Sequence, residues 1–127
     1  MEKIKVLIAD DHRVVREGLA AILKTKDDIN VVGEAQDGVE AVEKTKTLMP
    51  DVILMDVSMP RMGGIEATRQ IKREFPHMGI VALTMYEEQQ YIFDLVRAGA
   101  TGYLLQDSES SQILAAIRAL YRAESLI

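Results

Sequence analysis

The sequence predicts a doubly wound α/β fold, in which five parallel strands form one sheet with helices on both of its faces. Strand-like and helix-like hydrophobic patterns alternate from one end of the chain to the other, which is typical of repeated strand-helix-strand units. The apolar run 52–55 lacks the alternation of a half-exposed strand, and therefore indicates a strand covered by helices on both faces. A length of 127 residues suits one such domain.

The first third of the chain predicts a strand, a helix and a second strand. Residues 4–9 form the first strand. The helix is indicated by apolar residues spaced to share one face, namely Val14, Val15, Leu19, Ile22 and Leu23. After a polar connection, the segment 31–35 is a short, less hydrophobic strand that suits an edge of the sheet.

The second helix has signals at both of its ends. Asp37 is an expected N-cap, because its side chain can accept a hydrogen bond from the first turn. The helix carries Val39, Val42 and Leu48, and Pro50 ends it by disfavouring helical geometry at the residue before it. The buried strand 52–55 follows and leads directly into Asp56.

The remaining elements are separated by glycine and proline. Pro60 and the pair at 63–64 mark a loop before a helix that carries Ile65, Thr68 and Ile71 and ends at Pro76. Residues 79–83 and 102–105 are the fourth and fifth strands. Between them we expect a helix that stops at Gly99, with the apolar set Tyr91, Ile92, Leu95 and Val96. A last helix is expected over 108–122.

Composition excludes several classes of function. The chain has no cysteine, which excludes disulfides, thiolate catalysis and cysteine-based zinc sites. It has a formal charge of −5, which argues against direct contact with a nucleic-acid backbone. No apolar run approaches the roughly 20 residues of a membrane span, and the first residues do not resemble a signal peptide. We therefore expect a cytoplasmic domain.

Polar residues follow the predicted strands at their carboxyl ends, where doubly wound folds bind ligands. These residues are Asp10, Asp11, Asp56, Thr84 and Gln106. If the first and third strands are neighbours, the three carboxylates share one small cavity and repel one another unless a cation is bound. Magnesium suits such a set, because all the ligands are hard oxygens.

Each of these residues also has a structural interpretation. An acidic pair before a helix commonly serves as an N-cap, and a single aspartate after a strand commonly initiates a turn. Thr84 could be an ordinary β-branched strand residue, and Tyr103 a half-buried aromatic residue. The residues alone leave these alternatives open.

A longer motif favours the functional interpretation. Residues 56–64 read Asp-Val-Ser-Met-Pro-Arg-Met-Gly-Gly, and this run resembles the Asp-x-x-Met-Pro-x-Met-x-Gly motif of receiver domains in bacterial two-component response regulators. The resemblance extends over essentially the whole chain, through Asp10, Asp11, Thr84 and the Gly-Ala-x-Gly-Tyr run at 99–103. The segments 8–12 and 102–105 are most similar to the NarL/FixJ-like subfamily, which carries a C-terminal helix-turn-helix domain.

The resemblance implies the strand order 2-1-3-4-5 of the receiver, or flavodoxin-like, fold. It further implies that Asp56 accepts a phosphoryl group and that Mg²⁺ is held by Asp10, Asp11, Asp56 and the backbone carbonyl of Ser58. Thr84 would contact the phosphoryl group, and its shift would let Tyr103 rotate from solvent into the space vacated. Ser58 and Tyr86 are expected to flank the entry route for water.

One position departs from the family pattern. The family has lysine three residues after the switch aromatic residue, where this chain has Gln106. A glutamine amide donates a hydrogen bond without neutralising charge, so we hypothesise slower phosphorylation or weaker coupling to the switch. The alternative is a pseudo-receiver, which would act as a phosphorylation-independent interaction module.

The resemblance also implies domains and partners. We expect residues 1–122 to form the receiver and 123–127 to begin a linker to a DNA-binding domain. The partners would be a sensor histidine kinase docking near the first helix and, on phosphorylation, a second copy of the chain. The dimer would use helix four, strand five and helix five, or helices one and five.

The chain would not be an enzyme, beyond assisting its own phosphorylation and dephosphorylation. A haloacid-dehalogenase-like phosphatase would have a second aspartate at position 58, where this chain has Ser58. A flavodoxin-like cofactor binder would have a phosphate loop after the first strand, where this chain has two aspartates.

Overall fold

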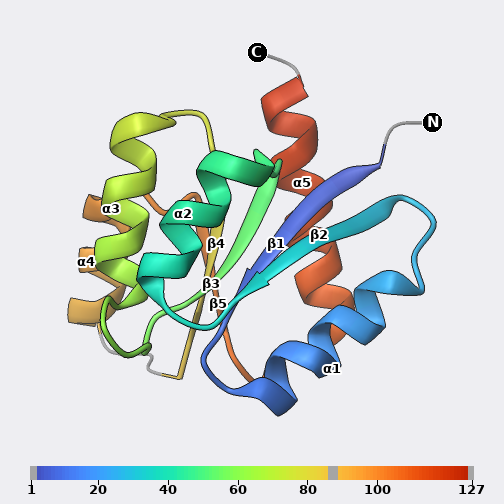
Figure 1. The fold of residues 1–127 in the computed structure, drawn as a ribbon, viewed down its shortest axis with the longest axis horizontal. Helices are drawn as coiled ribbons and strands as arrows, with labels where there is room; N and C mark the ends of the chain where they lie inside the picture. The colour runs from blue at the N-terminus through green and yellow to red at the C-terminus, as the bar shows by residue number, and fades with distance from the viewer. Residues whose placement is uncertain (1–2, 86–88, 126–127) are drawn as a thin grey trace.

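The predicted architecture is confirmed. The computed structural model describes residues 3–85 and 89–125, and in this part of the chain five strands alternate with five helices (Figure 1). The parallel strands lie in the order β2-β1-β3-β4-β5, with bounds β1 Ile4–Ala9, β2 Ile29–Ala35, β3 Val52–Asp56, β4 Gly79–Thr84 and β5 Gly102–Leu105. The helices are α1 Arg13–Lys24, α2 Gly38–Leu48, α3 Gly64–Glu74, α4 Gln89–Ala98 and α5 Ser110–Ser125.

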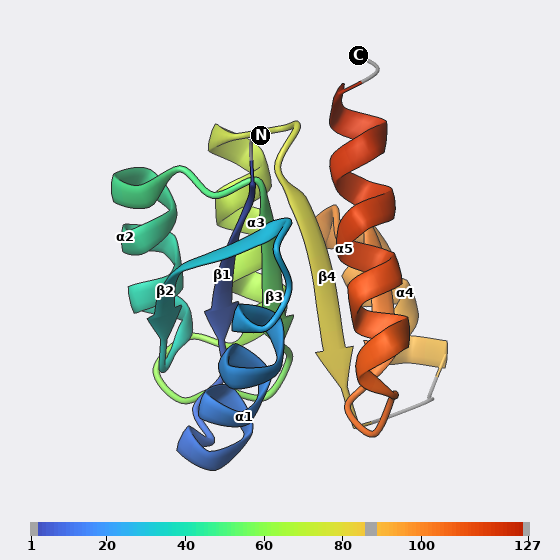
Figure 2. The ribbon, with the colours of Figure 1, turned by 90° about the vertical axis from the view of Figure 1, so that its right-hand side faces the viewer.

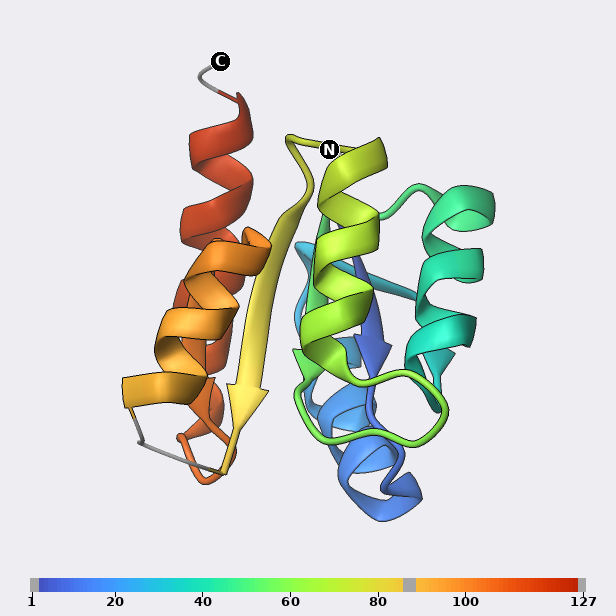
Figure 3. The same cartoon turned by 90° about the vertical axis from the view of Figure 1, so that its left-hand side faces the viewer.

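Helices cover both faces of the sheet. Helices α1 and α5 lie on one face (Figure 2), while α2, α3 and α4 lie on the other (Figure 3). Successive residues of a strand point to opposite faces, so β1 sends Val6 and Ile8 into the core under α1 and α5, and Leu7 into the core under α2 and α3. Every residue of β3 is buried, as the unbroken apolar run 52–55 predicts, and every residue of β4 is buried as well.

The predicted ends of α2 and α4 are confirmed. The Asp37 side chain caps α2 by accepting a hydrogen bond of 2.8 Å from the backbone N–H of Glu40. After α4, Gly99 has a φ of +103°, in the left-handed region that glycine adopts without strain. Asp37 thus fixes the connection from β2 into α2, and Gly99 the connection from α4 to β5.

The prediction of which α1 residues are buried is partly wrong. Leu23 is buried, but Val15 and Ile22 are 41% exposed and Val14 is 84% exposed. At 3.6 residues per turn, Val14 lies about half a turn from Leu23 around the helix axis. The core is contacted instead by a narrower stripe that includes Ala20. On α4, Val96 is likewise exposed while Leu95 is buried.

Smaller differences concern element boundaries. Strand β2 begins at Ile29, two residues before the predicted segment. Helix α5 begins at Ser110 and continues to Ser125, so residues 123–125 of the expected linker are helical. Residues 123–125 include no glycine or proline, so nothing in this segment ends the helix at residue 122. Tyr86 and the side chain of Tyr91, both named in the sequence analysis, lie outside the described residues.

Among the helices within 3–85 and 89–125, none is long and apolar enough to cross a membrane.

Candidate functional site

The three predicted carboxylates converge at the carboxyl edge of the sheet. Asp10 directly follows β1, and Asp56 is the last residue of β3. The two strands are neighbours, with Ala9 paired to Met55, so their ends bring Asp10 and Asp56 together. Ligand atoms of Asp10, Asp11, His12 and Asp56 all lie within 4.8 Å of one another. Asp10 and Asp56 are almost fully buried, whereas Asp11 is exposed.

Burial and like charge make this cluster electrostatically costly. Burial, and then the negative charge of Asp10, raise the pKa of the Asp56 carboxyl to about 7, against a smaller lowering effect of the Ser58 backbone. Asp10 Oδ2 and Asp56 Oδ2 are buried and have no hydrogen-bond partner among the described residues. Buried charge without partners is unfavourable, so the arrangement is one that a bound cation would stabilise.

The donor set fits a divalent cation. Three carboxylates from two adjacent strand ends offer hard oxygen ligands, and two of their oxygens point into the site without another partner. The three carboxylates predicted to hold Mg²⁺ are therefore close enough to share one ion. Ser58, the fourth predicted ligand, lies two residues after Asp56 in the loop that follows β3.

Gln106 contacts Asp56 directly. It follows β5, and its side-chain Nε2 donates a hydrogen bond of 2.7 Å to Asp56 Oδ1. Its backbone N–H also donates to the carbonyl of Thr84, over 2.9 Å, which attaches the end of β5 to the end of β4. The amide thus satisfies one oxygen of Asp56 but leaves its charge uncompensated.

The two predicted switch residues lie on the neighbouring strands. Thr84 is the last residue of β4 and is buried, and β4 pairs with β3 so that Asp56 lies opposite Leu83. Tyr103 lies on β5 opposite Ala82, and its side chain is 45% exposed. The Tyr103 side chain therefore faces solvent in this structure.

His12 is part of the cluster, although the sequence analysis quoted it only within a motif. Its Nδ1 lies 3.1 Å from Asp10 Oδ1, 3.1 Å from Asp11 Oδ1 and 4.0 Å from Asp56 Oδ2. The hydrogen bond to Asp10, followed by the charge of Asp11, raises the pKa of the imidazole above its usual value. The sequence signal for this contact is the direct adjacency of the histidine to two strand-end aspartates.

The loop after β3 is held tightly against α2. Arg61, in a left-handed conformation with a φ of 63°, donates through Nε to Asp37 Oδ2 over 2.9 Å. The backbone N–H of Gly38 donates to the carbonyl of Met62 over 2.9 Å. A Cβ on Gly64 would lie 2.1 Å from the carbonyl oxygen of Asp56, so only glycine allows α3 to start this close to the site.

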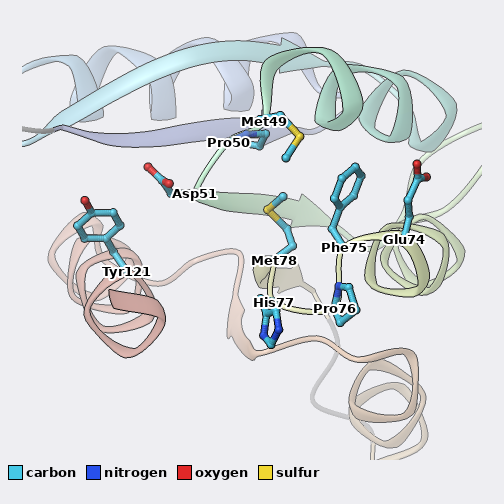
Figure 4. A pocket seen from close by; sticks show the side chains of 9 residues that line it. All are labelled: Met49, Pro50, Asp51, Glu74, Phe75, Pro76, His77, Met78 and Tyr121. Carbon is cyan, nitrogen blue, oxygen red and sulfur yellow. The ribbon is translucent and has the colours of Figure 1, made fainter. Parts of the chain in front are cut away.

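A cavity of about 540 Å³ lies at the other end of the sheet (Figure 4). Its lining includes Asp51, which precedes β3, and Met78, which precedes β4, together with Tyr121 of α5. None of the predicted site residues lines it. The cavity is therefore separate from the acidic cluster.

Comparison with known proteins identifies the family to which the chain is similar. The family model described as the response regulator receiver domain matches residues 6–118. The chain is 45% identical over 125 residues to the oxygen regulatory protein NreC of Staphylococcus carnosus, and also 45% identical over 125 residues to the uncharacterized transcriptional regulatory protein YxjL of Bacillus subtilis. Each match covers 98% of this chain, but only 58% and 57% of the respective relative.

A solved structure shows the same fold. The signal receiver domain of the putative response regulator NarL from Mycobacterium tuberculosis superposes with a TM-score of 0.92 at 33% identity, covering 96% of this chain and 98% of that domain. The name of this regulator agrees with the NarL/FixJ-like subfamily that the sequence motifs predict. The chain belongs to the family of response regulator receiver domains.

Proposed function

We propose that this receiver domain is a phosphorylation-controlled switch whose phosphoacceptor is Asp56. The observation that carries the proposal is the buried Asp56 carboxylate at the end of β3, next to Asp10 and Asp11 and with one oxygen unpartnered. Asp10 Oδ1 accepts a hydrogen bond of 2.8 Å from the backbone N–H of His12, as a turn residue does, but a turn role does not account for Asp10 Oδ2 and Asp56 Oδ2, which have no partner among the described residues. An acceptor of a phosphoryl group and a cation must instead leave an oxygen available.

The proposed reaction is a phosphoryl transfer from phosphohistidine or an acyl phosphate. An oxygen of the Asp56 carboxylate attacks phosphorus, and the new O–P bond forms as the bond to the donor breaks. The donor departs with the electron pair of that bond, an acyl phosphate as its carboxylate and phosphohistidine as imidazole, which takes a proton from solvent. Asp10, Asp11, Asp56 and the Ser58 carbonyl would hold Mg²⁺, which when bound neutralises negative charge on the transferred group.

The remaining site residues would position the product and transmit its presence. The Gln106 amide already donates to Asp56 and would donate to a phosphoryl oxygen in the same place. Thr84, at the end of β4, would donate its hydroxyl to another oxygen. The exposed Tyr103 would then turn inward, which converts a local charge into a changed surface over α4 and β5.

Exposed apolar side chains support two proposed interactions. Val14, Val15 and Ile22 lie exposed on α1, where a sensor histidine kinase would dock. Phe93 and Val96 on α4 and Tyr103 on β5 are exposed, and α4 and β5 belong to one of the two faces proposed for dimerisation after phosphorylation. The relatives are named as transcriptional or oxygen regulators and are longer than this chain, so we propose a DNA-binding output domain that follows residues 123–127.

A pseudo-receiver is the second candidate function. The specific observation that favours it is the neutral Gln106 amide in contact with Asp56, where the family has lysine. Such a domain would keep the fold and its protein contacts but would not respond to phosphoryl donors. It would not act as an enzyme on an external substrate in either case.

The test is the intact mass of the protein after incubation with acetyl phosphate, with and without Mg²⁺. The expected result is a phosphoryl adduct that requires Mg²⁺ and is absent from Asp56→Asn. A folded protein that never forms the adduct contradicts the proposal and supports the pseudo-receiver.

A further inference from the structure

The position of His12 is not explained by the start of α1. His12 occupies the N-cap position of this helix, where serine, threonine, aspartate or asparagine normally accept a hydrogen bond from the first turn. The imidazole makes no such capping bond. It turns instead toward the carboxylates, and its side chain remains 57% exposed on the open side of the site. The side chain therefore interacts with the cluster rather than with the helix.

The distances from His12 resemble those within one coordination shell. In an octahedral ion with ligands at about 2.1 Å, adjacent ligand atoms lie about 3.0 Å apart and opposite ones about 4.2 Å. The His12 Nδ1 lies 3.1 Å from an oxygen of Asp10 and 3.1 Å from an oxygen of Asp11. It lies 4.0 Å from Asp56 Oδ2. One nitrogen and three carboxylates thus lie close enough together to bind a single ion, once Nδ1 gives up its hydrogen bond to Asp10 Oδ1.

A second observation indicates a ligand in this space. Asp10 Oδ2 and Asp56 Oδ2 are buried, belong to residues that are at most 1% exposed, and have no hydrogen-bond partner among the described residues. Gln106 contributes a neutral amide and so does not supply the missing positive charge. The site therefore offers both unsatisfied oxygens and a nitrogen donor.

We propose that His12 is a metal ligand of this site, and that the resulting set of three carboxylates and one imidazole selects a first-row transition dication such as Mn²⁺, Co²⁺ or Zn²⁺ over Mg²⁺. The inference rests on the proposed function only in that the same carboxylates hold the ion. Imidazole is a preferred ligand of transition ions, whereas Mg²⁺ takes oxygen ligands almost exclusively. A nitrogen ligand thus strengthens binding of the first group and contributes little to the second.

The chain offers an internal control, because His12 and His77 are its two histidines. His77 lies in the lining of the cavity at the other end of the sheet. We would record the imidazole proton resonances of the whole chain during titration with Co²⁺, a paramagnetic ion. The expected result is a large contact shift of the His12 ring protons with unchanged His77 signals. Binding of Co²⁺ without a contact shift at His12, or no binding of Co²⁺ to folded protein, overturns the proposal.

Calorimetric titrations with Mn²⁺, Zn²⁺ and Mg²⁺ test selectivity. His12→Asn retains a good N-cap residue and removes the imidazole, and His77→Asn is the matched control. The expected result is a loss of at least about tenfold in Mn²⁺ and Zn²⁺ affinity for His12→Asn alone, with Mg²⁺ affinity nearly unchanged. If His12 is instead only an internal counter-charge, its removal tightens Mg²⁺ binding, and this outcome contradicts the proposal.

The two proposals fail separately. Phosphorylation of Asp56 that requires Mg²⁺, in a protein whose His12 never contacts the metal, overturns this inference and leaves the proposed function intact. A His12 contact shift without any phosphoryl adduct supports the inference and contradicts the proposed function.

Discussion

Polar side chains at the two ends of the sheet differ in whether their oxygens have hydrogen-bond partners, and the half-buried Asp51 and exposed Thr101 at the amino edge contrast with the buried Asp10 and Asp56 at the carboxyl edge. At the amino edge, Asp51 Oδ2 accepts a hydrogen bond of 2.8 Å from the backbone N–H of Lys5, and Thr101 Oγ1 accepts one of 3.1 Å from Ile80. At the carboxyl edge, Asp10 and Asp56 each keep one oxygen without a partner among the described residues. The polar groups at the amino edge therefore stabilise the fold. The carboxylates at the carboxyl edge destabilise it, in a place where a ligand can compensate their charge.

The largest expected effect comes from neutralising the charge at the carboxyl edge. Burial and Asp10 raise the pKa of Asp56 to about 7, above its unfolded value, so the folded state binds the proton more tightly. The penalty of the ionised group is absent near pH 4, grows as pH rises to 7, and is complete above pH 7. Asp56→Asn should therefore raise the free energy of unfolding by roughly 2–4 kcal/mol at pH 8, and by little near pH 4.

Urea unfolding of both proteins across this pH range, without divalent ions, measures the effect. Asp51→Asn is the matched control at the amino edge, and it should not stabilise the protein at any pH because its carboxylate already accepts the Lys5 N–H. An equal gain from both variants would contradict the comparison between the two edges.

A second effect tests how closely the backbone approaches the site. A Cβ on Gly64 would lie 2.1 Å from the Asp56 carbonyl oxygen, whereas a Cβ on Gly79 at the amino edge would lie 3.4 Å from the Asp51 carbonyl oxygen. Gly64→Ala should cost about 3 kcal/mol by forcing the backbone apart, and Gly79→Ala should cost much less. Denaturant unfolding of the two variants checks this, and similar losses would show that the carboxyl edge is no tighter than the amino edge.

The sequence predicted which residues gather at the edge of the sheet better than it predicted which helix residues are buried. The convergence of Asp10 and Asp56 followed from the rule that parallel strands end at the same edge, and the Asp37 cap followed from local hydrogen bonding. The exposure of Val14 could not be predicted, because apolar residues are spread around α1 and periodicity does not give the rotation of a helix against its sheet. The strand order came with the family resemblance rather than from the pattern.

The adjacency of His12 to two aspartates is visible in the sequence, but the direction of its ring and its approach to Asp56 could not be predicted from it. The direction of its side chain depends on the backbone at the N-cap, where φ is −88° and ψ is 103°. A histidine at such a position has no characteristic capping bond, so the residue type alone does not indicate where the ring lies. Tertiary structure decides this contact, since Asp56 is 44 residues away along the chain.

Substitution of Gln106 allows a positive charge to be added at the carboxyl edge, whereas Asp56→Asn removes a negative one. Gln106→Lys should place a cation against Asp56, lower its pKa and hold the phosphoryl group by a charge-assisted bond, which is stronger by about 1 kcal/mol than a neutral one. We expect phosphorylation by acetyl phosphate to become about fivefold faster, in line with that difference. Initial rates from intact mass measure this, with Gln106→Met as the uncharged control. An unchanged rate for the lysine variant would mean that the neutral amide does not limit the reaction.

The smallest effect tests whether an unpartnered buried group always marks function. Thr68 on α3 is fully buried and its Oγ1 has no hydrogen-bond partner among the described residues, whereas Thr45 on α2 is equally buried and its Oγ1 donates to the Ala41 carbonyl over 2.8 Å. Thr68→Val should stabilise the protein by about 1 kcal/mol, because it removes an unsatisfied hydroxyl at nearly constant volume, and Thr45→Val should destabilise it or leave it unchanged. Thermal unfolding of both variants measures the two signs. If Thr68→Val is more stable and is still phosphorylated at the normal rate, the single unpartnered hydroxyl of Thr68 reflects packing alone. The feature that marks the carboxyl edge as the functional site is then the clustering of several unpartnered groups of like charge. Loss of phosphorylation in a stable Thr68→Val would extend the functional region from the strand ends into α3.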